Sequence, residues 1–152
     1  MNRIKVGVIG ATGMVGQRFI TLLENHPYFQ IADLYASARS AGRSYGEAVE
    51  GRWKMATPLS EAIAATVDMV FCAVNMPKEE IRVYEEALAK AEIPVVSNNS
   101  AHRMTPDVPM IIPEVNPRHT DLIPIQRKRL GTRRGFIAAK PNCSIQSYVP
   151  LI

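Results

Sequence analysis

The chain begins with the run Ile4-Lys5-Val6-Gly7-Val8-Ile9, which leads directly into Gly10-Ala11-Thr12-Gly13-Met14-Val15-Gly16. The first run is apolar except for Lys5, as expected of a strand in a parallel sheet that is covered on both faces. The glycines allow a tight turn and a close approach of the backbone to a ligand. An amphipathic helix over residues 14–24 would point its first N–H groups at the same place. The junction predicts a binding site for the pyrophosphate of a dinucleotide.

The glycine spacing is Gly-x-x-Gly-x-x-Gly rather than the commoner Gly-x-Gly-x-x-Gly. A glycine-rich turn also occurs for purely structural reasons, and this alternative stays open. The position after a strand and before a helix favours the dinucleotide interpretation. We therefore assign these residues to cofactor binding: Gly10, Thr12, Gly13, Met14, Val15 and Gly16.

Length and composition are those of one soluble domain. The chain has 152 residues, of which 47% are hydrophobic and 21% charged, values typical of a globular protein with a real core. No apolar stretch approaches the ~20 residues that span a bilayer, so we expect no membrane partner. Residues 1–3 leave no room for a signal peptide, and the two cysteines make no disulfide framework. Both observations predict a cytoplasmic protein.

The net charge of +4 raises the question of a nucleic-acid partner. Much of the excess lies in Arg127-Lys128-Arg129, at the end of a predicted helix that Gly131 follows. Basic side chains are favoured at a helix C-terminus by the helix dipole. Aromatic residues are not interleaved with the basic ones, as they are in single-strand binders. We expect no nucleic-acid partner, and we assign no metal-binding residues.

Strands and helices alternate along the chain. We predict strands over residues 4–9, 31–36, 67–74, 93–97, 110–112 and 135–139. We predict helices over residues 14–24, 59–66 (with Ser60 as N-cap), 78–91 and 120–130 (with Pro124 in the first turn or at a kink), and from residue 144 onward. Residues 37–58 are predicted to form a loop. This alternation predicts βαβ units and an α/β fold, a Rossmann-like, doubly wound, mostly parallel sheet.

The final predicted helix stops in mid-pattern at Leu151-Ile152, which is unusual for the end of a chain. We therefore expect residues 1–141 to form a Rossmann-like NADP-binding domain. Residues 142–152 would form a nucleophile turn and the first turns of a second domain, for catalysis and dimerisation, that is absent from this chain.

The segment Ala36-Ser37-Ala38-Arg39-Ser40 follows the second predicted strand. Dinucleotide folds that prefer NAD place an Asp or Glu at this point for the ribose hydroxyls. Here there is no acid, because Asp33 lies inside the predicted strand. Arg39 offers a planar fork for a 2′-phosphate, and Ser37 and Ser40 add hydroxyl donors. The segment predicts NADP rather than NAD, against the alternative of an ordinary polar loop.

Cys143 follows the last predicted strand across Lys140-Pro141-Asn142. Ligands of open α/β sheets bind beyond the carboxyl ends of the strands, where this residue falls. A helix N-terminus and a nearby lysine both favour a thiolate nucleophile. An inert buried cysteine is the alternative, and position alone does not decide between the two. Cys72, within an apolar strand, is predicted to be core.

Several motifs together resemble the aspartate-semialdehyde dehydrogenases. Lys140-Pro141-Asn142-Cys143-Ser144 is similar to the family's Asn-Cys-Ser/Thr active-site motif. The glycine loop and the segment 36–42 resemble its nucleotide and NADP-phosphate loops. The segments 97–104 and 112–117 resemble the archaeal and fungal branch. The resemblance covers only the N-terminal portion of the family, up to and just past the cysteine.

The resemblance implies NADP-dependent reductive dephosphorylation of aspartyl 4-phosphate to aspartate 4-semialdehyde through a cysteine thioester. This reaction belongs to lysine, threonine and methionine biosynthesis. Cys143 carries over as the nucleophile and Asn142 as its neighbour that orients the substrate. Arg103 aligns with the arginine that binds the phosphate, and Asn116 is a weaker assignment near the substrate or nicotinamide. N–H groups after Cys143 are candidates for an oxyanion hole, and the whole enzyme would be a homodimer or homotetramer.

Two departures from the family pattern stand out. Ile145 occupies a position where the family usually has Thr. The family's general-base histidine lies downstream of the cysteine, whereas His26, His102 and His119 all lie upstream. We therefore expect this chain alone to bind NADP without turnover. Related N-acetyl-γ-glutamyl-phosphate and malonyl-CoA reductases, and a non-catalytic NADP-binding or redox-sensing domain, remain alternatives.

Overall fold

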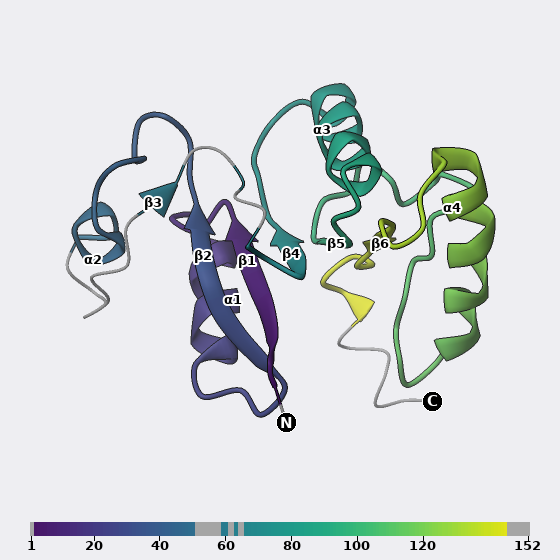
Figure 1. Ribbon diagram of the computed structural model, residues 1–152, viewed down its shortest axis with the longest axis horizontal. Helices are drawn as coiled ribbons and strands as arrows, with labels where there is room; N and C mark the ends of the chain where they lie inside the picture. Colours follow the sequence, from purple (N-terminus) through teal and green to yellow (C-terminus); the bar gives the residue numbers. More distant parts are fainter. Residues whose placement is uncertain (1, 51–58, 61–62, 64–65, 146–152) are drawn as a thin grey trace. The chain divides into compact units, whose positions relative to one another are not determined.

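The computed structural model describes residues 2–50, 59–60, 63 and 66–145 (Figure 1). The chain divides into two compact units, Met1–Asn75 and Met76–Ile152. Each unit alternates strands with helices, and every strand pair within a unit is parallel. The predicted α/β class is confirmed. In the part of the chain that the structure describes, no helix is long and apolar enough to cross a membrane.

The first unit is built around strand β1. Its elements in chain order are β1 (Ile4–Ile9), α1 (Met14–Leu23), β2 (Phe29–Tyr35), α2 (Tyr45–Ala48), β3 (Leu59–Ser60) and β4 (Met69–Cys72). The strand order is β3-β2-β1-β4, which matches four of the six strands in the order common in dinucleotide-binding folds. The chain therefore crosses back over β1 between β3 and β4, and β1 lies inside the sheet.

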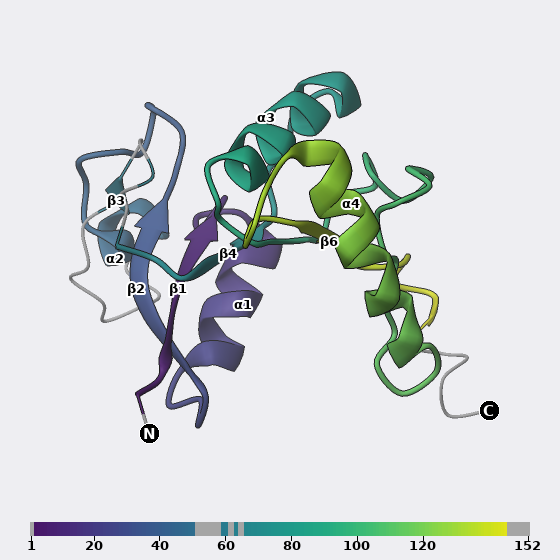
Figure 2. The same cartoon turned by 45° about the vertical axis from the view of Figure 1, so that its right-hand side comes forward.

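The core of the first unit lies between the sheet and α1. Figures 1 and 2 both show α1 along one face of β1 and β2. Ile20 and Leu23 of α1 are buried against Val6, Val8 and other residues of one apolar cluster. Residues 6–9 at the end of β1 are all buried, rather than alternately buried and exposed. This is the pattern of a strand that is covered on both faces. Cys72 is fully buried, which confirms its assignment to the core.

Two predictions fail in the first unit. Helix α2 lies inside the segment predicted as loop. The signal for it was present, because Ser44 and Glu47 form a reciprocal capping box in which Ser44 N donates to Glu47 Oε2 at 3.2 Å. Leu59–Ser60 is a strand paired with Leu34 and Tyr35 rather than the start of a helix. This strand forms because it pairs with β2, which lies far away in the sequence. The remainder of the predicted helix lies largely outside the described residues.

The second unit contains α3 (Lys78–Lys90), β5 (Val95–Ser97), the 3-10 helix η1 (Pro117–Leu122), α4 (Ile123–Leu130) and β6 (Ile137–Ala139). β5 and β6 pair in parallel, and α3 contacts both strands. Gln126 joins α4 to the strand: its Nε2 donates to Ile137 O at 3.0 Å, and its Oε1 accepts from Ile137 N at 2.6 Å. This fully buried amide satisfies backbone groups that would otherwise lack partners.

The strand predicted over residues 110–112 is wrong. Only Met110 forms a bridge, to Ala139, and the N–H of Ile112 donates to the Asn116 side chain at 2.7 Å. Pro109 and Pro113 lack the N–H groups that a longer ladder needs. Pro124 lies in the first turn of α4, as predicted.

The basic residues at the end of α4 have partners within the unit. Arg129 pairs with Asp107 and, at 2.9 Å, with Glu86. Arg127 donates to Arg134 O at 2.8 Å and lies over the Phe136 ring. Gly131 ends the helix in the left-handed conformation at φ 72°. These contacts explain part of the local positive charge without an external partner.

The turn between β1 and α1 brings backbone segments into close contact. Gly10 has φ +79°, and a Cβ built on it would lie 2.4 Å from Ala73 O. A Cβ on Gly16 would lie 2.1 Å from Gly10 O, whereas on Gly13 the nearest atom would be 3.3 Å away. Gly10 and Gly16 are therefore required for packing, whereas a Cβ on Gly13 would make a tight contact that a small shift can relieve.

We predict that Gly16→Ala destabilises the protein, because its methyl group would push α1 away from the turn. The expected loss is about 1–3 kcal/mol of unfolding free energy, as for other overpacked sites. Thermal and urea denaturation will measure it. Gly13→Ala is the matched control and should lose less stability, because its Cβ would lie 3.3 Å rather than 2.1 Å from Gly10 O; equal losses in the two variants would contradict the packing argument.

Glu92 joins the end of α3 to the turn before β6. Its carboxylate accepts hydrogen bonds from the N–H groups of Arg133, Arg134 and Gly135 at 2.6–3.1 Å. These bonds favour the ionised form and lower the pKa of Glu92 from 4.5 to about 2. Since the pKa is lower in the folded protein, the stabilisation is present above pH 4.5 and is lost as the pH falls toward 2.

Glu92→Gln should therefore lower the melting temperature at pH 7, and the difference from the parent should shrink as the pH falls from 4.5 to about 2. Melting curves followed by circular dichroism across this range will test it. Glu24→Gln, an equal charge change at the exposed end of α1, should not show this pH dependence. A Glu92 difference that is constant with pH would refute the carboxylate's role.

Candidate functional site

The glycine turn of the first unit is tied to the end of β2. The N–H groups of Gly10 and Ala11 both donate to Tyr35 O, at 3.0 and 3.1 Å, and Gly13 N donates to Gly10 O at 3.0 Å. The first N–H groups of α1 have no carbonyl partner within the helix. No acidic residue lies in the first turn of α1, and no side chain caps it. This helix end can therefore bind an anion.

Two apolar side chains at this helix end are exposed to solvent. Met14 is 86% and Val15 39% exposed, while Thr12 is half-buried and Gly13 exposed. Gly13 is exposed and has no side chain to cover the backbone of the turn, so a phosphate can approach that backbone. The turn therefore fits the pyrophosphate of a dinucleotide, and all the loop residues predicted for the cofactor lie at it.

A second turn follows β2. Ser37 O accepts hydrogen bonds from Ser40 N at 2.8 Å and Ala41 N at 3.0 Å. Arg39 lies exposed on this turn and has no ion pair within the part of the chain that the structure describes. Asp33 lies inside β2, as predicted, where its Oδ1 accepts from Leu34 N at 2.8 Å. The turn thus offers a cation and hydroxyl groups, and no acid, where an adenosine ribose is held in related folds.

Cys143 belongs to the second unit and is exposed. The Lys140 ammonium lies 3.9 Å from its sulfur, a distance at which it can pair with a thiolate. The Asn142 Oδ1 accepts from the N–H and the hydroxyl of Ser144, at 3.1 and 3.2 Å. The thiol is therefore presented to solvent by a hydrogen-bonded turn. Most of the helix predicted to follow lies outside the described residues.

The hydrogen bonds of this turn bear on the expected oxyanion hole. Ser144 N donates to Asn142 Oδ1 and Ile145 N to Asn142 O, at 3.1 Å each. These two N–H groups already have acceptors within the turn, and the N–H groups that follow lie outside the described residues, so the oxyanion hole stays a prediction. The Nδ2 group of Asn142 makes no hydrogen bond to the described residues and can donate to a ligand.

Arg103 holds the backbone that leads to the thiol. Its Nε donates to Lys140 O at 3.0 Å, and its Nη2 donates to Asn98 O at 3.3 Å and Pro141 O at 3.4 Å. Only Nη1 has no partner in the described part of the chain. The structure thus brings Arg103 to the cysteine turn, but it leaves one nitrogen rather than a bidentate fork for a phosphate.

Asn116 lies in the loop after Met110. Its Nδ2 donates to Met110 O at 3.0 Å and lies 3.1 Å from His119 Nδ1, and its Oδ1 accepts from Ile112 N. Its amide therefore holds this loop together, a local task that the sequence did not indicate.

The three histidines have distinct surroundings. His26 follows α1, and its Nδ1 accepts from Tyr28 N and Phe29 N. His119 lies exposed in η1. His102 is buried, and desolvation lowers its pKa below the usual 6.5, so it is neutral at pH 7.

Two further residues connected to the cysteine turn were not predicted from the sequence. Ser97 O accepts from Lys140 N at 2.8 Å, and the Ser97 hydroxyl donates to the buried Glu85 at 2.6 Å. A signal for Glu85 existed, because it continues the buried stripe of Ile81 and Leu88 at helical spacing. An acidic residue in an apolar stripe indicates a polar partner in the core.

Comparison with known proteins places this geometry in a family. The family described as "Semialdehyde dehydrogenase, NAD binding domain" matches residues 5–123. An aspartate-semialdehyde dehydrogenase of Aspergillus fumigatus is 44% identical over 93% of this chain and 41% of its own length. One from Methanothermobacter thermautotrophicus is 45% identical over 93% of this chain and 42% of its own length. The chain thus spans less than half of these relatives.

Solved structures agree with the sequence relatives. The aspartate semialdehyde dehydrogenase of Candida albicans, solved with NADP, has a TM-score of 0.82 at 35% identity, over 99% of this chain and 46% of its own. Aspartate semialdehyde dehydrogenase II of Vibrio cholerae, complexed with ASA, has a TM-score of 0.76 at 29% identity, over 99% of this chain and 46% of its own. The prediction of a Rossmann-like fold and the resemblance stated above are confirmed. The chain belongs to the semialdehyde dehydrogenase family, whose NAD-binding domain it contains.

Proposed function

We propose that this chain is the NADP-binding and nucleophile-bearing part of an aspartate-semialdehyde dehydrogenase. The observation that supports this most directly is the exposed Cys143 thiol beside Lys140, on a turn clamped by Arg103. Relatives named aspartate-semialdehyde dehydrogenase match 93% of the chain, and one solved relative holds NADP. The substrates are aspartyl phosphate in the biosynthetic direction, and aspartate semialdehyde with phosphate in the reverse direction.

In this proposal the Cys143 thiolate attacks the acyl carbon of aspartyl phosphate. The carbon–oxygen bond to phosphate breaks, phosphate leaves, and an aspartyl thioester remains on the sulfur. NADPH, when bound, supplies the hydride that reduces this acyl group to the aldehyde level. Release of aspartate semialdehyde then returns the thiolate. Asn142 Nδ2 and Arg103 Nη1 are the groups of this unit that can donate to the substrate.

The cofactor would be held by the first unit. The Gly10–Gly16 turn and the start of α1 would bind the pyrophosphate. Arg39, Ser37 and Ser40 would bind the 2′-phosphate, which distinguishes NADP from NAD. The proposal assigns no general base within this chain and gives Asn116 an indirect role, through the loop that it holds. For the whole protein, the family resemblance also supports a cytoplasmic homodimer or homotetramer.

Alkylation by iodoacetamide, followed by mass spectrometry of each cysteine peptide, tests the nucleophile. We expect Cys143 to react faster than free cysteine at pH 7, and NADP to slow the reaction. Cys72 is fully buried and serves as the internal control for folding. A Cys143 rate no higher than that of the free amino acid, with no protection by NADP, would favour a non-catalytic binding domain.

Arg39→Ala should weaken NADP binding by about 1–3 kcal/mol, roughly 5- to 150-fold, because the 2′-phosphate loses its charged donor. NAD binding should stay unchanged. Titration of NADPH and NADH by fluorescence measures both. Arg43→Ala is the matched control, since Arg43 donates instead to Glu47 O at 3.3 Å. Equal NADPH affinity of the Arg39 variant and the parent would refute the assignment.

A further inference from the structure

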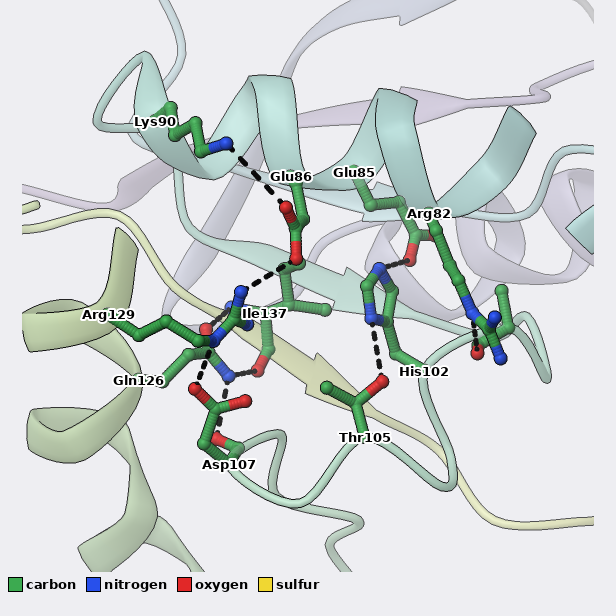
Figure 3. Close-up of polar contacts among 11 residues, drawn as sticks. Arg82, Glu85, Glu86, Lys90, His102, Thr105, Asp107, Gln126, Arg129 and Ile137 are labelled. Atoms are coloured by element: carbon green, nitrogen blue, oxygen red, sulfur yellow. Dashed lines mark hydrogen bonds and ion pairs between the residues drawn. The ribbon is translucent and has the colours of Figure 1, made fainter. Parts of the chain in front are cut away.

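Helix α3 carries two adjacent glutamates with different surroundings (Figure 3). Glu86 faces Arg129 and Lys90 near the surface, at 2.9 and 3.6 Å. Glu85 is 0% exposed and points toward His102. A buried carboxyl group is costly unless its oxygens have partners. The partners of Glu85 therefore indicate what the group does.

All the partners of Glu85 belong to one segment, residues 97–105, which we call the arginine loop because it contains Arg103. The Glu85 Oε1 accepts from Ser97 Oγ at 2.6 Å and from Asn99 Nδ2 at 2.8 Å. Its Oε2 lies 3.9 Å from His102 Nε2. One carboxyl group thus lies against three residues in the first two thirds of the loop.

Two further contacts reinforce this arrangement. His102 Nδ1 lies 3.2 Å from Thr105 Oγ. A neutral ring that accepts this hydroxyl proton presents its Nε2–H to Glu85, so one tautomer suits both neighbours. One turn before Glu85, Arg82 Nε donates to Ala101 O at 2.9 Å. Figure 3 shows Glu85 directed from α3 toward His102, with Arg82 next to it, while the neighbouring Glu86 is directed toward Arg129.

The arginine loop in turn holds the backbone before Cys143. Ser97 O accepts from Lys140 N at 2.8 Å, and Arg103 Nε donates to Lys140 O at 3.0 Å. Both backbone groups of Lys140 are therefore bound by the loop that Glu85 anchors. The Lys140 ammonium is the group next to the Cys143 sulfur. A continuous set of hydrogen bonds leads from α3 to the thiol.

We propose that Glu85 is a positioning residue for the cysteine turn, which acts through the arginine loop. Loss of its carboxyl oxygens leaves the Ser97 hydroxyl and the Asn99 amide without this partner in the core, so the loop shifts or loosens. Arg103 and Lys140 then no longer hold their places beside Cys143. The importance of that placement for catalysis rests on the proposed function. The hydrogen-bonded connection from Glu85 to the cysteine turn does not depend on it.

The test compares Glu85→Ala and Glu85→Gln with Glu86→Gln in the whole chain. Hydrogen exchange of peptides covering residues 97–105 and 140–145 is measured with Cys143 alkylation. We expect Glu85→Ala to raise exchange in both segments about tenfold and to slow alkylation by a similar factor. Glu85→Gln keeps an Oε1 acceptor for Ser97 and Asn99, so it should restore most of the parent behaviour. Glu86→Gln removes the same charge and should leave both readouts unchanged.

Reactivity of Cys72 reports unfolding that reaches the first unit, and the helical circular dichroism signal reports unfolding of the whole chain in every variant. If Glu85→Ala exposes Cys72, Ser97→Ala replaces it and should raise exchange in residues 140–145 in the folded protein. Parent-like exchange there in a folded variant overturns the proposal, and so does an equal effect of Glu86→Gln. A parent Cys143 no more reactive than free cysteine would refute the proposed function, while the exchange data would still judge the role of Glu85.

Discussion

The start of α1 lies so close to the end of β1 that no side chain fits between them. A Cβ on Gly16 would lie 2.1 Å from Gly10 O, so the helix can begin at this point only with glycine there. The close approach sets the direction of α1, buries Ile20 and Leu23 on the sheet, and leaves the first N–H groups of the helix facing outward. The packing of the first unit and its anion-binding turn thus follow from the same contact.

The second unit uses polar side chains, two of them fully buried, for a comparable purpose. Gln126 satisfies the backbone of Ile137, Glu92 gathers three N–H groups before β6, and Glu85 anchors the loop that contains Arg103. Gln126 and Glu92 bind backbone groups that a short strand leaves unpaired, whereas Glu85 binds the side chains of Ser97 and Asn99. Such groups are costly when unpaired, so each has a strong preference for one arrangement of its loop. A reactive thiol on a surface turn needs support of this kind, because the turn itself has little buried area.

The features that could be predicted from sequence are those with a local cause. The first strand, α1, α3 and the position of Pro124 follow from apolar periodicity and from the missing N–H of proline. Helix α2 could have been found from the Ser44–Glu47 capping box. The strand at Leu59–Ser60 could not, because its existence depends on pairing with β2. Residues 110–112 failed for a related reason, since Asn116 takes the N–H that a ladder would have used.

The residues of the candidate site also fall into two groups, those that the local sequence predicts and those that only the tertiary structure brings together. The amino-acid order alone was enough to identify the glycine turn, the basic residue after β2 and a cysteine beyond the last strand, because each is defined by neighbours within a few positions. Folding decided which groups support that cysteine. Arg103 and Lys140 are 37 positions apart, and Glu85 and Ser97 are 12 apart. Side-chain contacts between residues so far apart in sequence depend on how helices and strands pack, and the apolar periodicity of the sequence does not predict them.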